Sequence, residues 1–563
     1  MNKKTPIWLT IAIAVIALVA GLLIDRYCLN PSTSHPGRDP KVKAMLNLIA
    51  QEYVDTVSPR ELMERSIPLI LRGLDPHTAY FDTQTSKISK NKPDGVVPDI
   101  GIVFITINDT IIVECVVPDG AGDKAGLMPG DRIMAIDGKS TTNGNLNTGE
   151  VMKLMSGADG SELTMAVLRQ GNPQPIDVTV TRDRIKEHSI GSCYMMDKTT
   201  GYIKVNQFER KAYQEFVQAL KRLQNEGAKR YMIDLRGNGG GYVNIAVLMV
   251  NEFLPPGQTI VTTRARHKKD DHTFKSDGKG AFQNAEVAVL IDEFSASASE
   301  IFAGAMQDND RGLIVGCRSY GKALVQKEFI LPDSSAIRMT TARYYTPCGR
   351  CIQKEYKRGN MEEYTNELVN RYKNGEMDHK DSIKVDKEQK FTTEHGRTVY
   401  GGGGIVPDIF VPRDTTGLTG YYFDVNNAGL LQRFAFAYSS DNRAALSKME
   451  DYKQFLRMAP NDEELINKFV DFAAENGITP RWYYINQSRD AILTNLKALI
   501  ARDIFGTQAY YPIVNRNDKT VQQALKALNK HKAVFPITEQ LELSSVVQKQ
   551  RGFFSELRKR WHL

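Results

Sequence analysis

The middle of the chain, residues 186–345, alternates short strand-like segments with longer helix-like segments. Apolar segments such as GYIKVNQF, RYMIDL, EVAVLIDE and GLIVG are typical of strands, whereas KAYQEFVQALKRLQNEG and SASEIFAGAMQD are typical of helices. Parallel strands need long crossover connections, and a helix usually supplies them. The alternation therefore predicts a largely parallel sheet covered by helices, as the core of a multidomain α/β protein.

The rest of the chain has room for further domains, because 563 residues correspond to roughly three to five domains of ~100–200 residues each. We expect a small helical domain at 40–95, a β-rich domain at 96–185, the βα core at 186–413 and a helical domain at 414–563. The stretch 354–398 is charged and has little apolar periodicity, which indicates a solvated insertion in the core.

The N-terminus carries an uncharged stretch of 18 residues, 7–24, after two lysines. Such a stretch is just long enough to cross a bilayer as a helix, and it exceeds the ~7–15 apolar residues of a secretory signal peptide. We therefore expect residues 1–25 to be an uncleaved signal anchor and 26–39 a linker. The lysines place the N-terminus in the cytoplasm, so the rest of the chain is expected in the periplasm, anchored to the inner membrane. A cleaved signal peptide and a buried core helix are the alternatives.

Charge and motif content argue against several classes of function. The net charge of +7, from 73 basic and 66 acidic residues, is mild for this length, so we expect no nucleic-acid partner. The sequence has no His-Glu-x-x-His zinc signature and no Gly-x-Ser-x-Gly nucleophile elbow. Residues 316–322 match the first part of a phosphate-binding P-loop. However, Ala323 stands where a serine or threonine should bind magnesium, and no amphipathic helix follows.

The segment FSASASEIFAGAM joins a strand ending at Asp292 to a helix beginning near Ser297. Ser297 and Glu300 have the Ser-x-x-Glu spacing of a capping box, so the serine could serve only to start the helix. A serine at a helix N-terminus is also well placed to be a nucleophile, because the backbone N–H groups and the helix dipole there stabilise a developing oxyanion. The spacing leaves both roles open.

A candidate base follows in the next βα unit. Lys322 lies in the loop after the next predicted strand, and the C-terminal ends of parallel strands share one edge of the sheet. Ser297 and Lys322 can therefore meet at that edge. A lysine acts as a base only when it is neutral, which requires a pocket that excludes water. The flanking apolar residues Ala323, Leu324 and Val325 could supply that pocket.

These residues belong to a longer segment, SASASEIFAGAMQDNDRGLIVGCRSYGKALVQ, that strongly resembles the core of the C-terminal processing peptidases, or tail-specific proteases. The resemblance extends from about residue 40 to 412. It includes LDPHTAYFD, the PDZ-like GIVF…AGLMPGDRIMAIDG, DLRGNGGG, YYTPCGR and GGGGIVPDI. The resemblance implies a crotonase/ClpP-like protease core and a serine endopeptidase that cuts proteins near their C-termini and needs no cofactor or metal.

The resemblance also assigns roles to individual residues. Ser297 is the implied nucleophile, and Lys322 is the implied general base. Gln326 would orient the lysine, which requires a helical turn between them, because an extended chain would separate the two by about 13 Å. The implied oxyanion hole consists of the N–H groups of Ala298 and Gly241.

The glycine loop DLRGNGGG departs from the usual family pattern. Gly237 and Gly239 replace an asparagine and a proline, so the loop is expected to be less preorganised. Asp234 and Arg236 are implied to hold this loop, although a simple ion pair at the end of a strand explains them equally well.

The PDZ-like segment is implied to choose the substrate. Such a domain adds a peptide strand to its own edge and holds the terminal carboxylate on backbone N–H groups. The expected carboxylate cradle is the loop formed by Ile100, Gly101, Ile102 and Val103. The expected partners are therefore proteins with free C-termini. The alternative is that these residues are ordinary strand core.

Cys348 and Cys351 replace the two serines of the usual Tyr-Tyr-Thr-Pro-Ser-Gly-Arg-Ser motif. We predict a local disulfide between them, because the turn TPCGRC can bend tightly and the expected compartment is oxidising. A pair of free thiols and half of a zinc site are the alternatives.

The leading hypothesis is a membrane-anchored serine protease with PDZ-mediated recognition of protein tails. The alternative from another class is a PDZ-based scaffold or pseudoprotease that binds tails without cutting them, and the presence of Ser297, Lys322 and Gln326 argues against it. A nucleotide-dependent enzyme is a weaker alternative. By analogy with the family, the helical ends at 40–90 and 414–563 are candidate dimerisation arms of a homodimer. The sequence identifies neither a substrate nor a regulatory partner.

Overall fold

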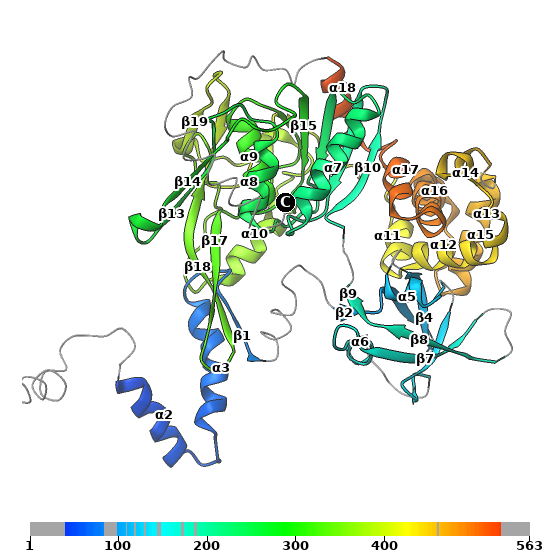
Figure 1. Ribbon diagram of the computed structural model, residues 1–563, viewed down its shortest axis with the longest axis horizontal. Coiled ribbons are helices and arrows are strands. Elements are labelled where there is room, and N and C mark those ends of the chain that lie inside the picture. The colour runs from blue at the N-terminus through cyan, green and yellow to red at the C-terminus, as the bar shows by residue number, and fades with distance from the viewer. Residues whose placement is uncertain are drawn as a thin grey trace, which may run out of the picture. The chain divides into compact units, whose positions relative to one another are not determined.

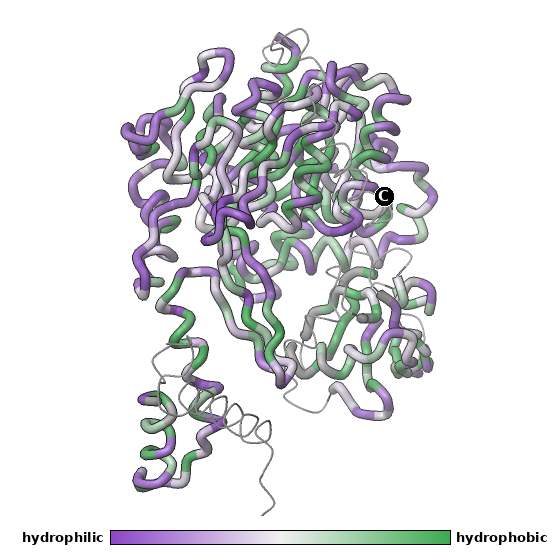
Figure 2. Tube along the Cα trace, turned by 60° about the vertical axis from the view of Figure 1, so that its left-hand side comes forward, coloured by the Kyte–Doolittle hydropathy of each residue, from purple (hydrophilic) through white to green (hydrophobic). Residues whose placement is uncertain are grey.

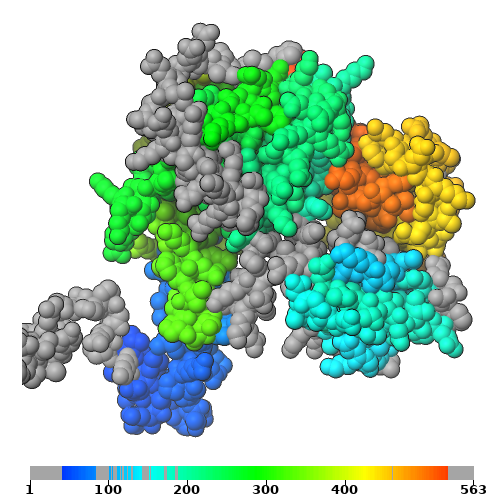
Figure 3. All heavy atoms as spheres, viewed as in Figure 1, coloured from blue at the N-terminus to red at the C-terminus, as the bar shows by residue number. Residues whose placement is uncertain are grey.

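The computed structural model describes residues 40–83, 98–107, 110–116, 120–128, 131–142, 148–169, 174–184, 188–458 and 461–530. The chain divides into two compact units, Met1–Gly73 and Leu74–Leu563 (Figure 1). Figure 3 shows the described residues as spheres, coloured from blue at the N-terminus to red at the C-terminus. The predicted membrane-spanning segment at 7–24 lies outside the described residues. None of the helices that the structure describes is long and apolar enough to span a bilayer.

Two helices make up the described part of the first unit. They are α2 (Pro40–Glu52) and α3 (Pro59–Arg72), within the segment that apolar spacing predicted to be helical. The prediction that this helical domain extends to residue 95 is wrong. Ala79–Phe81 form a strand, β1, which belongs to the second unit and pairs antiparallel with β18 there. A three-residue strand is too short to show a periodicity, so only its backbone pairing identifies it.

The second unit begins with the predicted β-rich domain. Its elements are β2 (Pro98–Asp99), β3 (Ile102–Ile107), β4 (Thr110–Val116), α5 (Ala121–Lys124), β5 (Arg132–Ile136), β6 (Lys139–Ser140), α6 (Thr148–Met155), β7 (Glu162–Leu168), β8 (Ile176–Thr181) and β9 (Asp183–Arg184). The main sheet has the order β3-β4-β5-β7-β8, with β6 beside β5, and its strand pairs are antiparallel. Every second residue of β7, such as Leu163 and Met165, is buried in the core of this domain. Strand β3 stands at one end of the strand order.

The predicted parallel sheet is confirmed in the βα core. Its elements are β10 (Ile190–Met195), β11 (Thr200–Val205), α7 (Ala212–Asn225), β12 (Arg230–Asp234), α8 (Val243–Asn251), β15 (Glu286–Ile291), α9 (Ala298–Asp308), β16 (Leu313–Gly316) and β21 (Ile409–Phe410). The strand order is β10-β11-β12-β15-β16-β21, and each neighbouring pair is parallel except β10–β11. The loops after β12, β15 and β16 therefore meet at one edge of the sheet.

Helices cover both faces of this sheet. On one face, side chains such as Ile233 and Val289 pack with α7, α8 and α9 in a common hydrophobic core, which Figure 2 shows as green segments in the interior. On the other face, Met232 and Leu290 pack with α18 (Lys519–Asn529), which Figure 1 shows beside β15. The prediction of a separate helical domain throughout 414–563 is therefore wrong for this helix.

A second sheet carries part of the functional site. Its strands are β1, β13 (Thr259–Ala265), β14 (His272–Lys275), β17 (Leu324–Ile330) and β18 (Ala336–Tyr345), in the order β1-β18-β13-β14 with β17 also on β18. The short elements are β19 (Lys390–Thr392), paired with β20 (Thr398–Tyr400), and the 3-10 helices η2 (Lys268–Asp270), η3 (Lys380–Ser382), η4 (Lys387–Gln389) and η5 (Thr507–Ala509).

The charged stretch 354–398 is mostly exposed, as predicted for a solvated insertion, but a few buried residues attach it to the core. It contains α10 (Met361–Lys373), and both Tyr364 and Arg371 of this helix are buried. The Arg371 guanidinium donates to the carbonyl oxygens of Ser319, at 2.7 Å, and Tyr320, at 3.2 Å. The composition of this stretch did not reveal these attachment points, because a buried charge such as Arg371 is partnered by the core.

The helices before α18 form a group with its own hydrophobic core. They are α11 (Gly420–Asn427), α12 (Leu430–Asp441), α13 (Arg443–Leu446), α14 (Tyr452–Met458), α15 (Asp462–Glu475), α16 (Trp482–Phe505) and α17 (Tyr510–Val514). Residues of the long helix α16, including Ile492, Leu496 and Ile500, are fully buried in that core. This group occupies the segment that was predicted to be helical.

Candidate active site

Ser297 lies where the loop after β15 enters α9. Its backbone adopts φ 55° and ψ −112°, in the half of conformational space that residues with a Cβ rarely occupy. Every residue of α9 itself is buried, whereas Ser297 is partly exposed. A strained backbone at a partly exposed serine is typical of a functional position, because the surrounding fold must hold it there.

The predicted capping spacing is present at the start of α9. The Ser297 N–H donates to Glu300 Oε2 at 2.9 Å, and the Glu300 N–H donates to the Ser297 carbonyl oxygen, also at 2.9 Å. The side chains of Ser297 and Glu300 have the arrangement of a capping box, although the Ser297 hydroxyl accepts no hydrogen bond of normal geometry from the helix. This hydroxyl is therefore available for chemistry, and its role as a nucleophile stays a prediction.

The Glu300 carboxylate connects α9 to the loop that carries Lys322. Its Oε2 accepts the Lys322 N–H at 2.8 Å, and its Oε1 accepts the Gly321 N–H at 2.7 Å and the Ser319 hydroxyl at 2.5 Å. The side chain is fully buried, and this burial raises the pKa of Glu300 to about 7. Four donors converge on this one carboxyl group, counting the Ser297 N–H.

Tyr344, which lies in β18, also connects the segment of Ser297 to that of Lys322. Its hydroxyl lies 3.1 Å from the carbonyl oxygen of Ser297 and 2.9 Å from that of Lys322. Its ring is buried in the core. The structure therefore brings the backbones of Ser297 and Lys322 to the same edge of the sheet, as the parallel strands implied.

Lys322 is partly buried, which suits a base. Its Nζ donates to Gln326 Oε1 at 3.3 Å. Burial of the ammonium lowers the pKa of Lys322, and the positive charge of Arg338 lowers it further, while Glu300 and Asp75 act in the opposite direction. Desolvation is the main cause of this lowered pKa. The sequence analysis had identified exclusion of water as the requirement for a neutral lysine.

Gln326 contacts Lys322, although not through the helical turn that was expected. It lies in β17, an extended strand, where the pairing with β18 shifts register between Val325 and Gln326. The long lysine side chain spans the distance, so the expectation of a turn was wrong while the contact is present. The Gln326 Nε2 donates to the carbonyl oxygen of His77 at 2.7 Å.

The glycine loop lies directly against Ser297. A Cβ on Gly240 would lie 2.8 Å from Ser297 Cβ and 2.9 Å from the Ala298 nitrogen, so only glycine fits there. The Gly240 N–H donates to Asn238 Oδ1 at 2.9 Å. Within the described residues, no acceptor is recorded for the N–H of Gly241 or of Ala298. These two groups are the predicted oxyanion hole, and their unused donors are consistent with that role.

Acidic residues hold the glycine loop in place. The Asp292 carboxylate accepts the Gly237 N–H at 2.9 and 3.0 Å. Arg236 pairs with Asp234 at 2.7 Å and with Asp518, just before α18, also at 2.7 Å. Asp234 and Arg236 therefore form an ion pair at the end of β12 and also support the glycine loop. The contact with Asp518 connects this loop to α18.

The P-loop reading is wrong for residues 316–322. The segment that follows is the strand β17, and a phosphate site would need a helix N-terminus there. Within the described part of the chain, no group of three His, Cys, Asp or Glu side chains could hold a metal ion.

The loop at the start of β3 turns at Gly101. Gly101 adopts φ 71°, and the Ile100 carbonyl accepts the Gly122 N–H at 2.6 Å. The side chains of Ile100 and Ile102 are buried in the domain core, so these two could contact a ligand only through their backbone. Val103 follows in β3, which pairs with β4 on one side. The carboxylate cradle stays a prediction.

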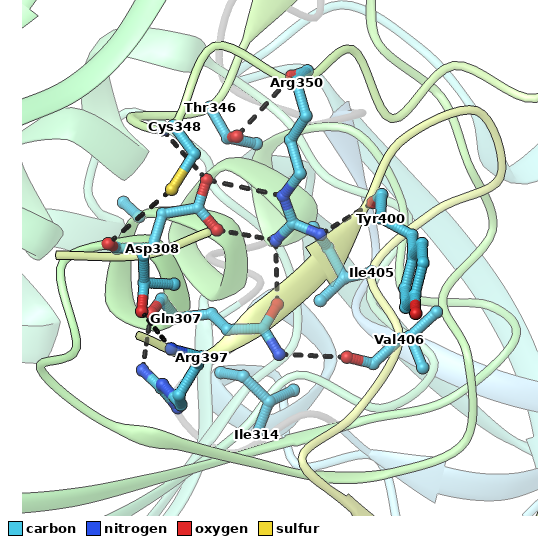
Figure 4. Close-up of polar contacts among 12 residues, drawn as sticks. Gln307, Asp308, Ile314, Thr346, Cys348, Arg350, Arg397, Tyr400, Ile405 and Val406 are labelled. Carbon is cyan, nitrogen blue, oxygen red and sulfur yellow. Dashed lines mark hydrogen bonds and ion pairs between the residues drawn. The ribbon is translucent and has the colours of Figure 1, made fainter. Parts of the chain in front are cut away.

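The predicted disulfide between Cys348 and Cys351 is not formed in the structure, where both are free thiols. The Cys348 thiol lies 3.6 Å from the Thr392 carbonyl oxygen, whereas Cys351 packs against the core of the βα sheet. Between them, the buried Arg350 guanidinium pairs with Asp308 at 2.6 Å (Figure 4). This buried ion pair fixes the turn, so the two sulfurs are directed to different surroundings.

Sequence reasoning missed three residues of the site. Tyr344, His77 and Arg371 lie in segments that were noted only as parts of a motif or as an insertion, and all three contact the Ser297, Lys322 or Gln326 segments. The motifs LDPHTAYFD and YYTPCGR contain the first two, so the resemblance was a usable signal for them.

Comparisons with known proteins identify relatives of this chain. The model of Peptidase family S41 matches residues 199–362, a PDZ domain model matches 112–169, and a family of unknown function (DUF8443) matches 421–506. The chain is 35% identical over 309 residues to a carboxy-terminal-processing protease of Bartonella bacilliformis, covering 54% of this chain and 70% of that protein. It is 30% identical over 319 residues to the carboxy-terminal processing protease CtpB of Bacillus subtilis, covering 56% and 65%. A solved structure of a photosystem II D1 C-terminal processing protease shares 21% identity and a TM-score of 0.34, covering 66% of this chain and 92% of that one.

Proposed function

Because the chain belongs to peptidase family S41 and is a carboxy-terminal processing serine protease with a PDZ domain, we propose that Ser297 is its nucleophile and Lys322 its general base. The observation that carries this proposal is the shared oxygen, Glu300 Oε2, which accepts a backbone N–H from both residues. The available hydroxyl of Ser297 and the lowered pKa of Lys322 support it.

The proposed reaction has two halves. The neutral Lys322 amine takes the proton of the Ser297 hydroxyl as its oxygen attacks the carbonyl carbon of the substrate, and the N–H groups of Ala298 and Gly241 bind the resulting oxyanion. The lysine then gives this proton to the leaving amine as the peptide C–N bond breaks. A water molecule repeats the sequence on the acyl-enzyme and releases the second product. Gln326 keeps the lysine in position throughout.

The proposed substrates are proteins with a free C-terminus. An extended peptide would pair with β3, the strand at the end of the PDZ sheet order, and its carboxylate would bind the N–H groups at Gly101 and Ile102. The alternative is a PDZ scaffold that binds tails without cutting them. It does not explain why Glu300 holds Ser297 and Lys322 side by side.

We also propose that residues 7–24 anchor the enzyme in the inner membrane with the protease in the periplasm. The support is the length and lack of charge of this stretch and the lysines before it. Extraction of membranes with alkaline carbonate tests the anchor. Release of the protein from the membrane would contradict it.

The main test uses the full chain with Ser297→Ala, with Lys322→Ala and with Lys322→Arg. All three should lose cleavage of an unstructured protein substrate, because arginine keeps the charge of Lys322 and cannot supply a neutral amine. Ser447→Ala, a change at an exposed serine of the C-terminal helices, is the control and should cleave normally. Substantial activity in Lys322→Arg would contradict the base role, and retained activity in folded Ser297→Ala would contradict the nucleophile. The Ser297→Ala protein can also retain its substrates for identification by mass spectrometry.

A further inference from the structure

The side-chain amide of Gln326 lies between Lys322 and the backbone of His77. Its Nε2 donates to the His77 carbonyl oxygen at 2.7 Å, and its Oε1 accepts from Lys322 Nζ at 3.3 Å. A carbonyl oxygen can only accept a hydrogen bond, so the amide NH₂ must face His77. The amide oxygen is consequently turned toward Lys322.

This orientation matters because a neutral lysine has two N–H donors and one lone pair. An amide oxygen beside Lys322 Nζ takes up one N–H and leaves the lone pair for the serine proton. An amide NH₂ in the same place would donate to the lone pair and block the base. We propose that the turn Asp75–Thr78, through the carbonyl oxygen of His77, sets the orientation of the Gln326 amide and so positions the catalytic base. This inference rests on the proposed function of Lys322.

The turn is closed by the carboxylate of Asp75. Asp75 Oδ1 accepts the N–H of His77 at 2.9 Å and the N–H of Thr78 at 3.0 Å, and the Thr78 hydroxyl donates to Asp75 Oδ2 at 2.5 Å. Both Asp75 and Thr78 are buried. A carboxylate that accepts three donors leaves the peptide at His77 little freedom, so its carbonyl oxygen has a fixed direction.

The turn is attached to β18 beside Gln326 itself. Thr340 is the partner of Gln326 in the β17–β18 pairing. Its hydroxyl donates to Asp75 Oδ1 at 3.0 Å, and its N–H donates to Thr78 Oγ1 at 3.2 Å. Strand β1, which begins directly after the turn at Ala79, pairs with the same strand. The turn and Gln326 are therefore both held against Thr340, at the same position along β18.

The insertion supports the turn from another element. The Tyr364 hydroxyl of α10 lies 2.8 Å from His77 Nε2, and the two rings are in edge contact. Lys354 Nζ lies 4.2 Å from the Tyr364 ring centroid and 4.1 Å from that of Tyr320. Burial and the nearby charge of Lys322 lower the pKa of His77 to about 4, so the imidazole stays neutral and adds no positive charge beside the base.

The decisive experiment is a double-mutant cycle on the full-length enzyme. Asp75→Ala should lower kcat by at least about tenfold and leave KM unchanged. Tenfold is about the lower end of the loss expected when a residue that orients a catalytic group through a hydrogen bond is removed. Asp75→Ala combined with Gln326→Ala should be no slower than Gln326→Ala alone, because both changes remove the same alignment. Rates should be measured with enzyme in excess, so that slow variants remain quantifiable. Additive losses would overturn the inference.

A conservative variant separates the hydrogen bonds of Asp75 from its charge. Asp75→Asn keeps an oxygen for the His77 and Thr78 N–H groups, so it should retain most of kcat. The groups that face Lys322 with charge or a titratable ring are Glu300 from α9, Arg338 from β18, and Asp75 and His77 from the turn. Removing the negative charge of Asp75 lowers the pKa of Lys322, so the acid limb of the pH profile should move to lower pH. A kcat as low as that of Asp75→Ala would contradict the positioning role.

Two further variants guard against a general loss of folding. Tyr364→Phe removes the hydroxyl that contacts His77 and that also interacts with Gln353 and Tyr320, and the part of its loss that acts through His77 should be absent in the Gln326→Ala background. Thr83→Ala, near the other end of the same segment, removes a hydrogen bond to the Asp333 carbonyl and should leave kcat unchanged. Full activity of Lys322→Ala or Gln326→Ala would contradict the proposed function itself. If both of those variants lose activity and the loss from Asp75→Ala adds to that from Gln326→Ala, only the role of the turn would be overturned.

Discussion

Ser297 and Lys322 donate their backbone N–H groups to the same oxygen atom, Glu300 Oε2, at 2.9 and 2.8 Å. Their carbonyl oxygens lie 3.1 and 2.9 Å from the Tyr344 hydroxyl. Residues that are 25 positions apart in the sequence are thus fixed to one another through two buried side chains. The backbones of the proposed nucleophile and base therefore move as one body, which is what preorganised proton transfer requires.

Replacing Ser297 should separate catalysis from stability. Ser297→Ala should abolish cleavage and change the free energy of unfolding little, because the hydroxyl accepts no hydrogen bond of normal geometry from α9. Glycine adopts the φ of 55° without strain, whereas inside an ordinary helix or strand a glycine is about 0.5–1 kcal/mol less stable than an alanine. Ser297→Gly should therefore be at least as stable as Ser297→Ala in urea unfolding. A clearly less stable glycine variant would show that this backbone is not strained.

The pH dependence of cleavage should follow the charge around Lys322. The active form of the lysine is the neutral one, so kcat/KM should rise with pH through its lowered pKa. Arg338→Gln removes a positive charge that lowers this pKa, so the acid limb should shift to higher pH. Lys327→Gln, at an exposed position of β17, is the matched control and should leave the profile in place. A shift of the Arg338→Gln profile to lower pH would exclude Lys322 as the base.

Glu300→Gln should be strongly damaging although it preserves shape. Both carboxylate oxygens of Glu300 accept two donors each, and the amide NH₂ of glutamine would face two of those donors. Two buried donors would then lack an acceptor, at a cost of about 1–3 kcal/mol each. Urea unfolding in a Ser297→Ala background, which avoids self-digestion, measures this loss. Unchanged stability together with normal cleavage in the otherwise native chain would contradict the role of this carboxylate.

Amidating the C-terminus of a good peptide substrate should raise KM and leave kcat largely unchanged. Amidation removes the charge that the N–H groups at Gly101 and Ile102 would bind. Steady-state kinetics on matched acid and amide peptides measures the effect. Gly101→Val should raise the KM of the acid peptide to a value near that of the amide peptide, because a β-branched residue is strained at φ 71° and would disturb the loop. Identical kinetics for both peptides with the native enzyme would argue against this loop as the tail reader.

Cys348 and Cys351 should be recovered as thiols from enzyme purified without reductant. Burial raises the pKa of Cys348 to about 12 and also raises that of Cys351, so both should alkylate slowly in the native protein at pH 8. In denaturant both should alkylate completely, as peptide mapping by mass spectrometry would show. Protection in denaturant that only a reductant removes would mean that the predicted disulfide forms after all.

The sequence was sufficient to place Ser297 and Lys322 at one site. The alternation of strands and helices is a local signal, carried by the period of apolar residues. Once it indicates parallel strands, chain connectivity puts the loops after β15 and β16 on the same edge of the sheet. The glycine loop after β12 reaches the same edge for the same reason. No knowledge of side-chain contacts was needed for these inferences.

Other parts of the site depended on contacts between segments far apart in the chain. Gln326 reaches Lys322 from an extended strand, and its amide is oriented by His77, 249 positions earlier in the chain. The charged stretch 354–398 is mostly exposed, and buried residues such as Tyr364 and Arg371 attach it to the core through contacts that composition alone cannot show. Cys348 and Cys351 stay apart because the buried Arg350–Asp308 pair fixes the turn between them. Local periodicity therefore determined where the chemistry gathers, whereas long-range hydrogen bonds and burial decided how each group is held.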